Sequence, residues 1–181
     1  MPDFHLEQSF EKTVIGVDEV GRGPLAGPVV SCACIFFDHS IPMEELQLID
    51  DSKKLTSLKR YKALRLILKM KKENKLNYRI GTASVEEIDK LNILNATILS
   101  MKRAVLKLKI KKGTIIVDGI IKLKIGNLIS KYFVNGDQLS ISIATASIIA
   151  KIYRDKYMAK IGKNYPFFKW QNNAGYGTSE H

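Results

Sequence analysis

The sequence predicts an α/β domain, and three observations support this class. Runs rich in β-branched and aromatic residues, typical of buried strands, occur at residues 13–18, 29–37 and 78–83. Longer stretches with apolar residues at helical spacing lie between and after them. The length of 181 residues is enough for one compact domain with a sizeable core. Strands that come first and then alternate with helices fit a single sheet covered by helices.

The first long helix is expected at residues 58–72. Its apolar residues Leu64, Ile67 and Leu68 have the spacing of a helix face that packs on a sheet. The loop before it, residues 50–57, is polar and then basic.

The second helix is expected to begin after Ser84. This serine and Glu87, three residues later, have the pattern of a capping box. Residues 85–108 then provide the length for one or two helices. Gly113 follows and precedes another predicted strand at residues 114–117.

The last third of the chain contains a short strand candidate at residues 132–134 and a long predicted helix at residues 141–161. The first half of this helix is unusually apolar, which indicates burial. The tail from residue 164 is aromatic, polar and rich in glycine, so we expect it to be irregular.

The charge of the chain is strongly positive. It carries 29 Lys and Arg against 18 Asp and Glu, a formal net charge of +11. Such a balance favours a polyanionic partner, although a lysine-rich proteome would produce it too. The densest basic run, KRAVLKLKIKK at residues 102–112, is either a solvated helix face or a track for phosphates.

The two cysteines, Cys32 and Cys34, lie two residues apart in a predicted strand. Their side chains therefore point to the same side, into the expected core, and cannot form a relaxed disulfide. Buried free thiols suit a reducing compartment. Residues 1–12 lack the profile of a signal peptide, and no apolar run approaches the ~20 residues of a membrane span. We expect a soluble cytoplasmic protein with no membrane partner.

Acidic residues follow three predicted strands. VIGVDEVG ends in Asp18 and Glu19, TIIVDG in Asp118, and KYFVNGD in Asp137. Catalytic and ligand sites of α/β sheets often lie where strands end, so these side chains are expected to converge. Carboxylates so close would repel one another, and Mg²⁺ or Mn²⁺ would relieve the conflict. Two such ions make a site for phosphodiester cleavage. Alternatively, each acid is a turn or cap residue, above all in the Asp-Gly pair.

The loop after the first strand, GRGPLA, matches the dinucleotide fingerprint G-x-G-x-x-[GA]. That fingerprint requires a helix to begin within it, whereas Pro24 and Pro28 flank a short loop here and another strand follows. Gly21 and Gly23 would instead allow a substrate to approach the backbone closely, and Arg22 could pair with a phosphate. A plain tight turn is the simpler alternative.

Six segments in order resemble the motifs of ribonuclease HII, the type 2 ribonuclease H of bacteria: GVDEVGRGPLAGPVV, DDSKKL, IDKLNILNATILSMKRAV, IIVDG, GDQLSISIATASIIAKIYRDKYM and GYGTSEH. The resemblance spans residues 14–181. It implies a ribonuclease H-like fold, a mixed central sheet flanked by helices, in a single catalytic domain of residues 1–181. Residues 164–181 are expected to form a C-terminal tail that contacts substrate.

The resemblance implies a metal-dependent endoribonuclease that cleaves RNA paired with DNA and single ribonucleotides embedded in duplex DNA, as in ribonucleotide excision repair. Two Mg²⁺ or Mn²⁺ ions would be held by the catalytic acids, which by their motifs are Asp18, Glu19, Asp118 and Asp137. We expect the cut on the 5′ side of the ribonucleotide, leaving 3′-OH and 5′-phosphate ends, because water and not the 2′-OH attacks the phosphorus. We expect a monomer whose partners are these nucleic acids.

The same resemblance implies the substrate contacts. Gly21, Arg22 and Gly23 would form the loop that reads the ribose 2′-OH and the neighbouring phosphate. Tyr176, in GYGT, would pack on the sugar at the cleavage junction. Lys53, in DSKKL, would face the nucleic-acid backbone.

Three features depart from the family pattern. Ile120 follows Asp-Gly where the family often has Asn, so a side-chain support of Asp118 is missing. Asn173 and Ala174 precede GYGT in place of the usual His-Lys, so a basic contact is missing. The chain also stops at His181, where relatives usually continue into another helix.

Two other functions are compatible with parts of the sequence. A non-catalytic nucleic-acid binder would share the basic surface, but carboxylates repel phosphates unless a metal intervenes. A ribonuclease HIII-type enzyme normally carries an extra N-terminal substrate-binding domain, and the Gly-Arg-Gly loop favours type HII.

Two further groups of residues have ordinary structural interpretations. Asp155, in YRDKY, is expected to be a helix-surface or ion-pair residue and not a metal ligand. Phe167, Phe168 and Trp170 could stack on bases, but a small aromatic anchor for the tail is favoured.

Overall fold

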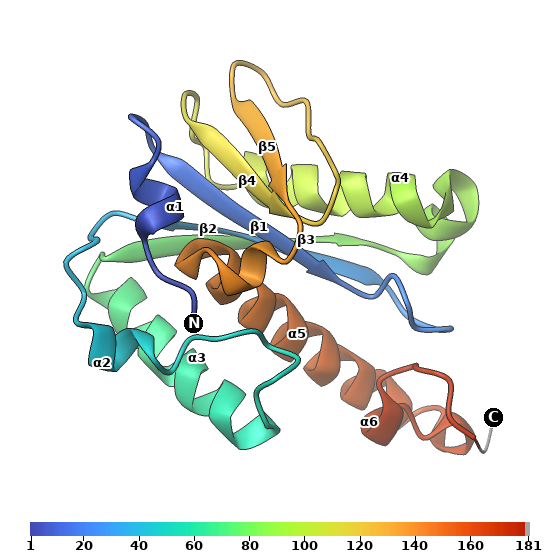
Figure 1. The fold of residues 1–181 in the computed structure, drawn as a ribbon. Coiled ribbons are helices and arrows are strands. Elements are labelled where there is room, and N and C mark those ends of the chain that lie inside the picture. Colours follow the sequence, from blue (N-terminus) through green and yellow to red (C-terminus); the bar gives the residue numbers. More distant parts are fainter. Residues whose placement is uncertain (180–181) are drawn as a thin grey trace.

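The chain folds around one mixed sheet of five strands with helices on both of its faces (Figure 1). The structure is a computed structural model that describes residues 1–179. Its strands are β1 (Val14–Val20), β2 (Val29–Phe36), β3 (Leu76–Ala83), β4 (Thr114–Asp118) and β5 (Ile129–Phe133). The predicted fold class is therefore confirmed, and β5 begins three residues earlier than the pattern 132–134 predicted.

The strands are ordered β3-β2-β1-β4-β5. The pairs β1–β2 and β2–β3 are antiparallel, whereas β1–β4 and β4–β5 are parallel. In the parallel pair Val17 lies beside Val117. This register brings Asp18 and Asp118, the next residue on each strand, to the same edge of the sheet.

The longest helices cover opposite faces of the sheet. In chain order the helical elements are α1 (His5–Gln8), α2 (Met43–Leu46), α3 (Ser57–Lys72), α4 (Val85–Leu106), η1 (Gly136–Gln138), α5 (Ile141–Gly162), η2 (Pro166–Phe168) and α6 (Trp170–Asn173). Helices α3 and α5 pack on one face, and α4 packs on the other (Figure 1). None of the helices within residues 1–179 combines the length and apolarity that a bilayer span requires.

Strand β2 is buried along its whole length because both of its faces are covered. Cys32 and Cys34 contribute to the core beneath α3 and α5, while Ala33 and Ile35 contribute to the core beneath α4. This alternation is the two-residue period of a strand. Both cysteines are buried free thiols, as expected from their spacing.

Helix α4 begins with the predicted capping box. Ser84 Oγ accepts the Glu87 N–H, and the Glu87 carboxylate accepts the Ser84 N–H at 2.9 Å. Within the helix Asn92 has φ 66° and ψ 166°, which breaks the helical path. The stretch predicted as one or two helices is therefore two helical segments joined at a kink.

Helix α5 crosses β1 with almost no clearance. A Cβ built on Gly16 would lie 2.4 Å from Ser142, so only glycine permits this approach. The contact fixes the start of α5 against the strand that carries Asp18. Beyond α5 the tail is more regular than expected, because it forms η2 and α6 before the glycine-rich end.

Candidate active site

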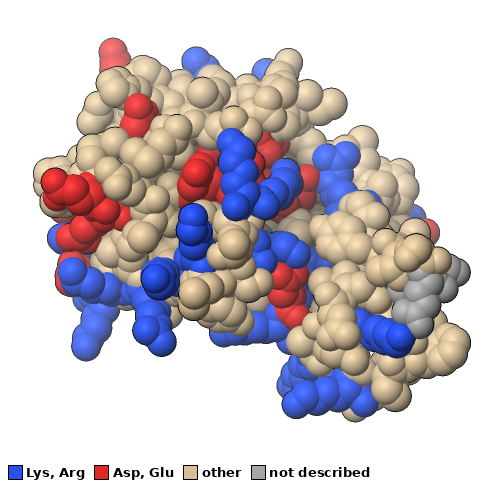
Figure 2. Space-filling view, turned by 60° about the horizontal axis from the view of Figure 1, so that its bottom comes forward, with Lys and Arg blue, Asp and Glu red and all other residues tan. Residues whose placement is uncertain are grey.

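Acidic side chains from three elements converge at one edge of the sheet. Asp18 comes from β1, Asp118 ends the neighbouring strand β4, and Asp137 lies on η1 directly after β5. Figure 2 shows acidic side chains gathered near the centre of one face with Lys and Arg side chains close around them. The convergence expected from the strand ends is therefore present.

Asp18 is held from two sides. Only 5% of the residue is exposed, and its Oδ1 accepts the Glu19 N–H at 2.7 Å. The Ser147 hydroxyl of α5 is a further hydrogen-bond partner of the carboxylate. Burial raises the pKa of Asp18 well above its ordinary value, and the negative charges of Glu19 and Asp118 raise it further.

The carboxylate of Asp118 is oriented by a main-chain N–H group. Its Oδ1 accepts the Gly136 N–H at 2.7 Å, which ties the end of β4 to the start of η1. Ile120, the residue after Asp-Gly, is 74% exposed. The expected loss of a side-chain support is thus accompanied by a backbone donor that orients the same carboxylate.

Asp137 contacts a fifth acid that the sequence reasoning did not single out. Burial, the charge of Asp118 and that of Asp51 raise the pKa of Asp137 to about 6, and its carboxyl is hydrogen-bonded to Asp51. Asp51 is buried in the loop before α3, where its Oδ1 accepts the Lys53 N–H at 2.9 Å. The doubled acid in DDSKKL was the available signal for it.

Glu19 is paired with the glycine loop. Arg22 Nη1 donates to Glu19 Oε1 at 3.4 Å, so this guanidinium lies beside an acid of the site. Burial raises the pKa of Glu19 although Arg22 acts against it, and the charge of Asp118 adds to the rise.

Lys53 lies beside the acids with its side chain exposed. Partial burial acts to lower the pKa of Lys53, but the carboxylates around it outweigh this and raise it overall: Asp18, Asp137, Asp51 and Asp118. In the structure this ammonium group partly offsets the negative charge of the cluster.

The donor set fits a hard divalent cation. Every candidate ligand is a carboxylate, and Mg²⁺ and Mn²⁺ prefer oxygen donors. Burial and, after it, the repulsion between neighbouring carboxylates raise the pKa values of Asp18, Glu19 and Asp137, and a bound cation would offset that repulsion. Within residues 1–179 the structure contains no preformed group of three or more His, Cys, Asp or Glu side chains able to hold a metal ion.

The glycine loop and the tail meet beside the acids. The Leu25 N–H donates to the Gly175 carbonyl at 2.8 Å, and a Cβ on Gly23 would lie 3.9 Å from the Tyr176 ring. Gly21 has φ +109°, and a Cβ there would lie 2.5 Å from the Pro28 carbonyl. No helix begins in this loop, so the dinucleotide fingerprint is not realised.

Tyr176 is 39% exposed, and Lys151 Nζ lies 5.6 Å from the centre of its ring. The rest of the motif reaches residues 180–181, which are outside the described part of the chain. The structure thus brings Tyr176 and the Gly-Arg-Gly loop together.

Two hydroxyls near the acids were not anticipated. Ser147 bonds to Ser52 at 2.8 Å between their Oγ atoms, in addition to its contact with Asp18.

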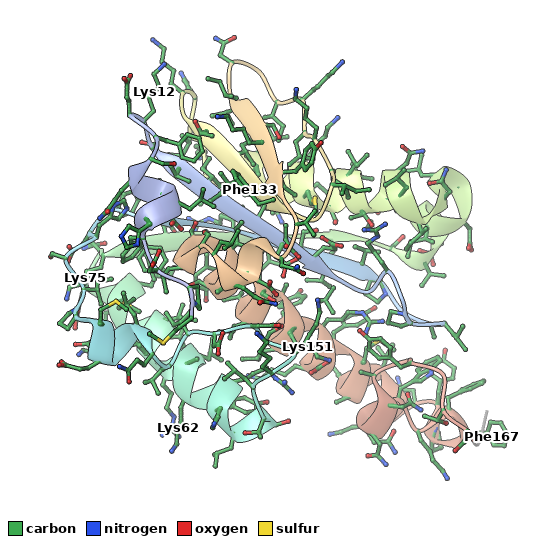
Figure 3. The ribbon with its side chains drawn as sticks, in the orientation of Figure 1. Lys12, Lys62, Lys75, Phe133, Lys151 and Phe167 are labelled. Atoms are coloured by element: carbon green, nitrogen blue, oxygen red, sulfur yellow. The ribbon has the colours of Figure 1, made fainter. Side chains whose placement is uncertain are left out.

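Asp155 forms the ion pair that its sequence context suggested, with Lys151 Nζ at 2.7 Å. Lys151, labelled on α5 in Figure 3, lines a pocket together with Tyr61 of α3 and Tyr176 of the tail.

The basic run at residues 102–112 begins on α4 and continues beyond it, and α4 covers the opposite face of the sheet from the acids. Arg103 pairs there with Glu87, and Lys107 Nζ donates to the Ile80 carbonyl at 2.8 Å. This placement favours the solvated helix face over a track for phosphates.

The aromatic residues of the tail pack on one another. Phe168 and Trp170 stack with ring centres 5.0 Å apart, while Phe167 is 88% exposed at the far end of the molecule (Figure 3). The stack supports the predicted aromatic anchor.

Comparison with known proteins gives a consistent result. Residues 15–181 match the family model described as Ribonuclease HII. A protein named Ribonuclease HII from Wolbachia pipientis (strain wPip of Culex pipiens) is 47% identical, over 99% of this chain and 87% of that protein. Another of the same name, from Fusobacterium nucleatum, is 48% identical over 94% of this chain and 77% of that protein.

Solved structures agree in fold. The ribonuclease H2 of Pyrococcus horikoshii OT3 superposes with a TM-score of 0.64 at 28% identity, over 92% of this chain and 82% of that one. Bst-RNase HIII in complex with Mn²⁺ has a TM-score of 0.68 at 20% identity, over 87% of this chain and 56% of that one.

Proposed function

The chain belongs to the ribonuclease HII family and is a ribonuclease H enzyme, and from this premise we propose that it cleaves the RNA strand of RNA–DNA hybrids and the 5′ side of single ribonucleotides in duplex DNA. The observation that carries the proposal is the meeting of two features on one face. The acids of β1 and β4 lie beside a glycine loop that is hydrogen-bonded to the tail carrying Tyr176.

Four acids would hold the divalent cations: Asp18, Glu19, Asp118 and Asp137. Mg²⁺ or Mn²⁺, when bound, supplies Lewis acidity toward the phosphodiester and offsets the charge of the acids. The protein's own contribution is orientation. Ser147 and the Glu19 N–H fix the Asp18 carboxylate, and the Gly136 N–H fixes that of Asp118.

The loop of Gly21, Arg22 and Gly23 would read the ribose. Without Cβ atoms the two glycines let a sugar approach the main chain, whose polar groups can bond the 2′-OH that only RNA presents. Tyr176 would press on the next sugar, where a deoxyribose fits and a second 2′-OH would crowd. Lys53, beside the acids, would face the backbone phosphates.

Cleavage would leave 3′-OH and 5′-phosphate ends, since the 2′-OH is read and is not the nucleophile. The histidines of the described residues support this. His5 pairs with Asp3, and His39 stacks on Phe4, so neither lies among the acids. Attack by the 2′-OH would require a general base, such as a histidine, at the reacting phosphate.

We further propose one catalytic domain over residues 1–181, with residues 164–181 as a substrate-contacting tail. The enzyme would act as a monomer in the cytoplasm, in ribonucleotide excision repair. The buried thiols of Cys32 and Cys34 are compatible with a reducing compartment.

The test is incubation with a labelled duplex holding one ribonucleotide, with and without Mg²⁺, resolved at single-nucleotide length. The proposal expects a metal-dependent cut on the 5′ side of that nucleotide. Binding without cleavage in saturating Mg²⁺ or Mn²⁺ would favour the non-catalytic binder. Products that end in 2′,3′-cyclic phosphate would overturn the proposed chemistry.

A further inference from the structure

Arg154 is a completely buried arginine whose guanidinium is satisfied by main-chain carbonyls. It is 0% exposed on α5. Nε donates to the Pro28 carbonyl at 3.0 Å, Nη2 to the Ala26 carbonyl at 2.8 Å, and Nη1 to the Ala174 carbonyl at 2.8 Å. Burying a cation costs several kcal/mol unless hydrogen bonds offset the loss of water, so these three bonds are needed for the residue to be there at all.

The three carbonyls belong to two segments far apart in the sequence. Ala26 and Pro28 close the loop that begins with Gly-Arg-Gly, and Ala174 lies two residues before Tyr176. Arg154 Cζ lies 5.9 Å from the centre of the Tyr176 ring. One side chain therefore joins the loop assigned to the 2′-OH and the tail that carries the tyrosine.

Three glycines leave room for the contacts between Arg154, the loop and the tail. A Cβ on Gly21 would lie 2.8 Å from Arg154 Nε, and one on Gly27 would lie 3.2 Å from Nη2. Gly175 has φ +83°, and a Cβ there would lie 2.5 Å from the Ala26 carbonyl oxygen. The loop and the tail are thus shaped around the guanidinium and each other.

A guanidinium suits this task because its donors point in fixed directions. A lysine would keep the charge, but its ammonium group cannot reach three carbonyls arranged for a planar fork. Without the three hydrogen bonds of the Arg154 guanidinium, the loop and the tail could shift relative to each other. The acids on β1, β4 and η1 are held by other hydrogen bonds.

We propose that Arg154 is a positioning residue that sets the spacing between the Gly-Arg-Gly loop and Tyr176, and through it the preference for a single ribonucleotide followed by DNA. This inference rests on the proposed function. Arg154 itself does not touch the substrate, because it is enclosed by the loop, the tail and α5.

The experiment compares kcat/KM on two substrates, a duplex with one embedded ribonucleotide and a continuous RNA–DNA hybrid. Arg154→Lys is expected to lower the ratio of the two values about tenfold or more, since small misplacements of positioning groups have effects of this size. In a Tyr176→Ala background the same change should leave the ratio unaltered, because the residue acts through the tyrosine.

Arg103→Lys is the matched control. Arg103 also makes three hydrogen bonds, to the Thr82 carbonyl and to both Glu87 oxygens, but on the opposite face of the sheet. It should change stability and leave the ratio of the two kcat/KM values as in the wild type.

Gly175→Ala disturbs the contact between the loop and the tail from the tail side and keeps the buried arginine. It therefore tests the inference if Arg154→Lys does not fold. It should lower the ratio as well. An unchanged ratio in the folded variants, or equal loss on both substrates, would overturn the inference. A wild-type enzyme with no preference for the single ribonucleotide would also overturn the inference. A wild-type enzyme that cleaves neither substrate in saturating Mg²⁺ would instead refute the proposed function.

Discussion

Helices α4 and α5 have 22 residues each and cover opposite faces of the same sheet, yet their polar side chains have different uses. On α5, Ser147, Lys151 and Arg154 are spaced four and three residues apart, so they share one side of the helix. Ser147 is hydrogen-bonded to Asp18, and Lys151 lies near the Tyr176 ring. Arg154 links the Gly-Arg-Gly loop to the tail.

On α4 the polar contacts serve packing. Arg103 pairs with Glu87 of the same helix, and the Ser100 hydroxyl donates to the Thr97 carbonyl and contacts Ser31 of β2. Two helices of equal length on one sheet thus differ in function according to where their polar side chains point. Those of α5 point at the edge of the sheet where β1 and β4 end.

The largest effect is expected at the acids that α5 supports. Asp18→Asn keeps the volume of the side chain and removes a charge that would bind metal, so cleavage should fall by roughly 10³-fold or more. Duplex binding and folding should remain. Single-turnover rates in saturating Mg²⁺ measure the loss, with Asp89→Asn on α4 as the control. Near-normal turnover would remove Asp18 from the catalytic group.

A smaller and selective effect is expected at Tyr176. Tyr176→Ala should lose roughly tenfold more activity on a single embedded ribonucleotide than on a long hybrid, since a stacked aromatic ring contributes about 1–3 kcal/mol. Tyr176→Phe should lose less if stacking dominates, and as much if the hydroxyl is needed. Parallel kcat/KM measurements on both substrates decide this, and equal losses would contradict the assigned role.

Ser147 of α5 and Ser100 of α4 are both buried, so the same substitution at each compares the two helices directly. Ser147→Ala on α5 removes a hydrogen bond to a carboxylate of the site and should lower kcat roughly tenfold. Ser100→Ala on α4 should leave kcat unchanged and lower the free energy of unfolding by about 1 kcal/mol. Urea melts and steady-state rates separate the two effects. If both variants lowered kcat alike, α5 would have no special role.

The acids should also destabilise the metal-free protein at neutral pH. Because the pKa of Asp137 is raised to about 6 in the folded state, its contribution to stability is present below its ordinary pKa and is lost as the pH rises through 6. Asp137→Asn should therefore gain about 1 kcal/mol relative to wild type at pH 7.5 and little at pH 4. Thermal melts in EDTA check this, and an equal difference at both pH values would contradict it.

The smallest effect concerns phosphate contacts. Affinity for a duplex should fall with salt by about 0.9 log units per contact for each decade. Lys151→Ala on α5 should reduce that slope by about 1, and Lys102→Ala on α4 should not. Fluorescence anisotropy at several salt concentrations measures both slopes. A loss of slope in the α4 variant alone would place the nucleic acid on the opposite face.

Much of the site could be predicted because it depends on local patterns. Strand periods placed Asp118 correctly at the end of its strand. Asp18 was expected at the end of β1 but lies inside it, because the strand continues to Val20. The two carboxylates still meet, since the parallel pairing of β1 with β4 stops one residue before each of them. The capping box at Ser84 is likewise local, and it fixed the start of α4.

Other features depend on packing between distant segments, and a local pattern does not reveal such contacts. Arg154 lies in YRDKY, which has the character of an exposed helix surface, and it is buried only because the loop and the tail fold over it. Asp51 reaches Asp137 because the loop before α3 passes beside η1. The basic run at residues 102–112 could be assigned to a face only once α4 was placed on the sheet.

Anomalous scattering from crystals of the protein soaked in MnCl₂ locates the cations themselves. We expect manganese peaks at the carboxylates of Asp18 and Asp118, with Glu19 and Asp137 as the further ligands, and loss of occupancy in crystals of Asp18→Asn. Peaks confined to other acids, or none at a concentration that supports cleavage, would contradict this expectation.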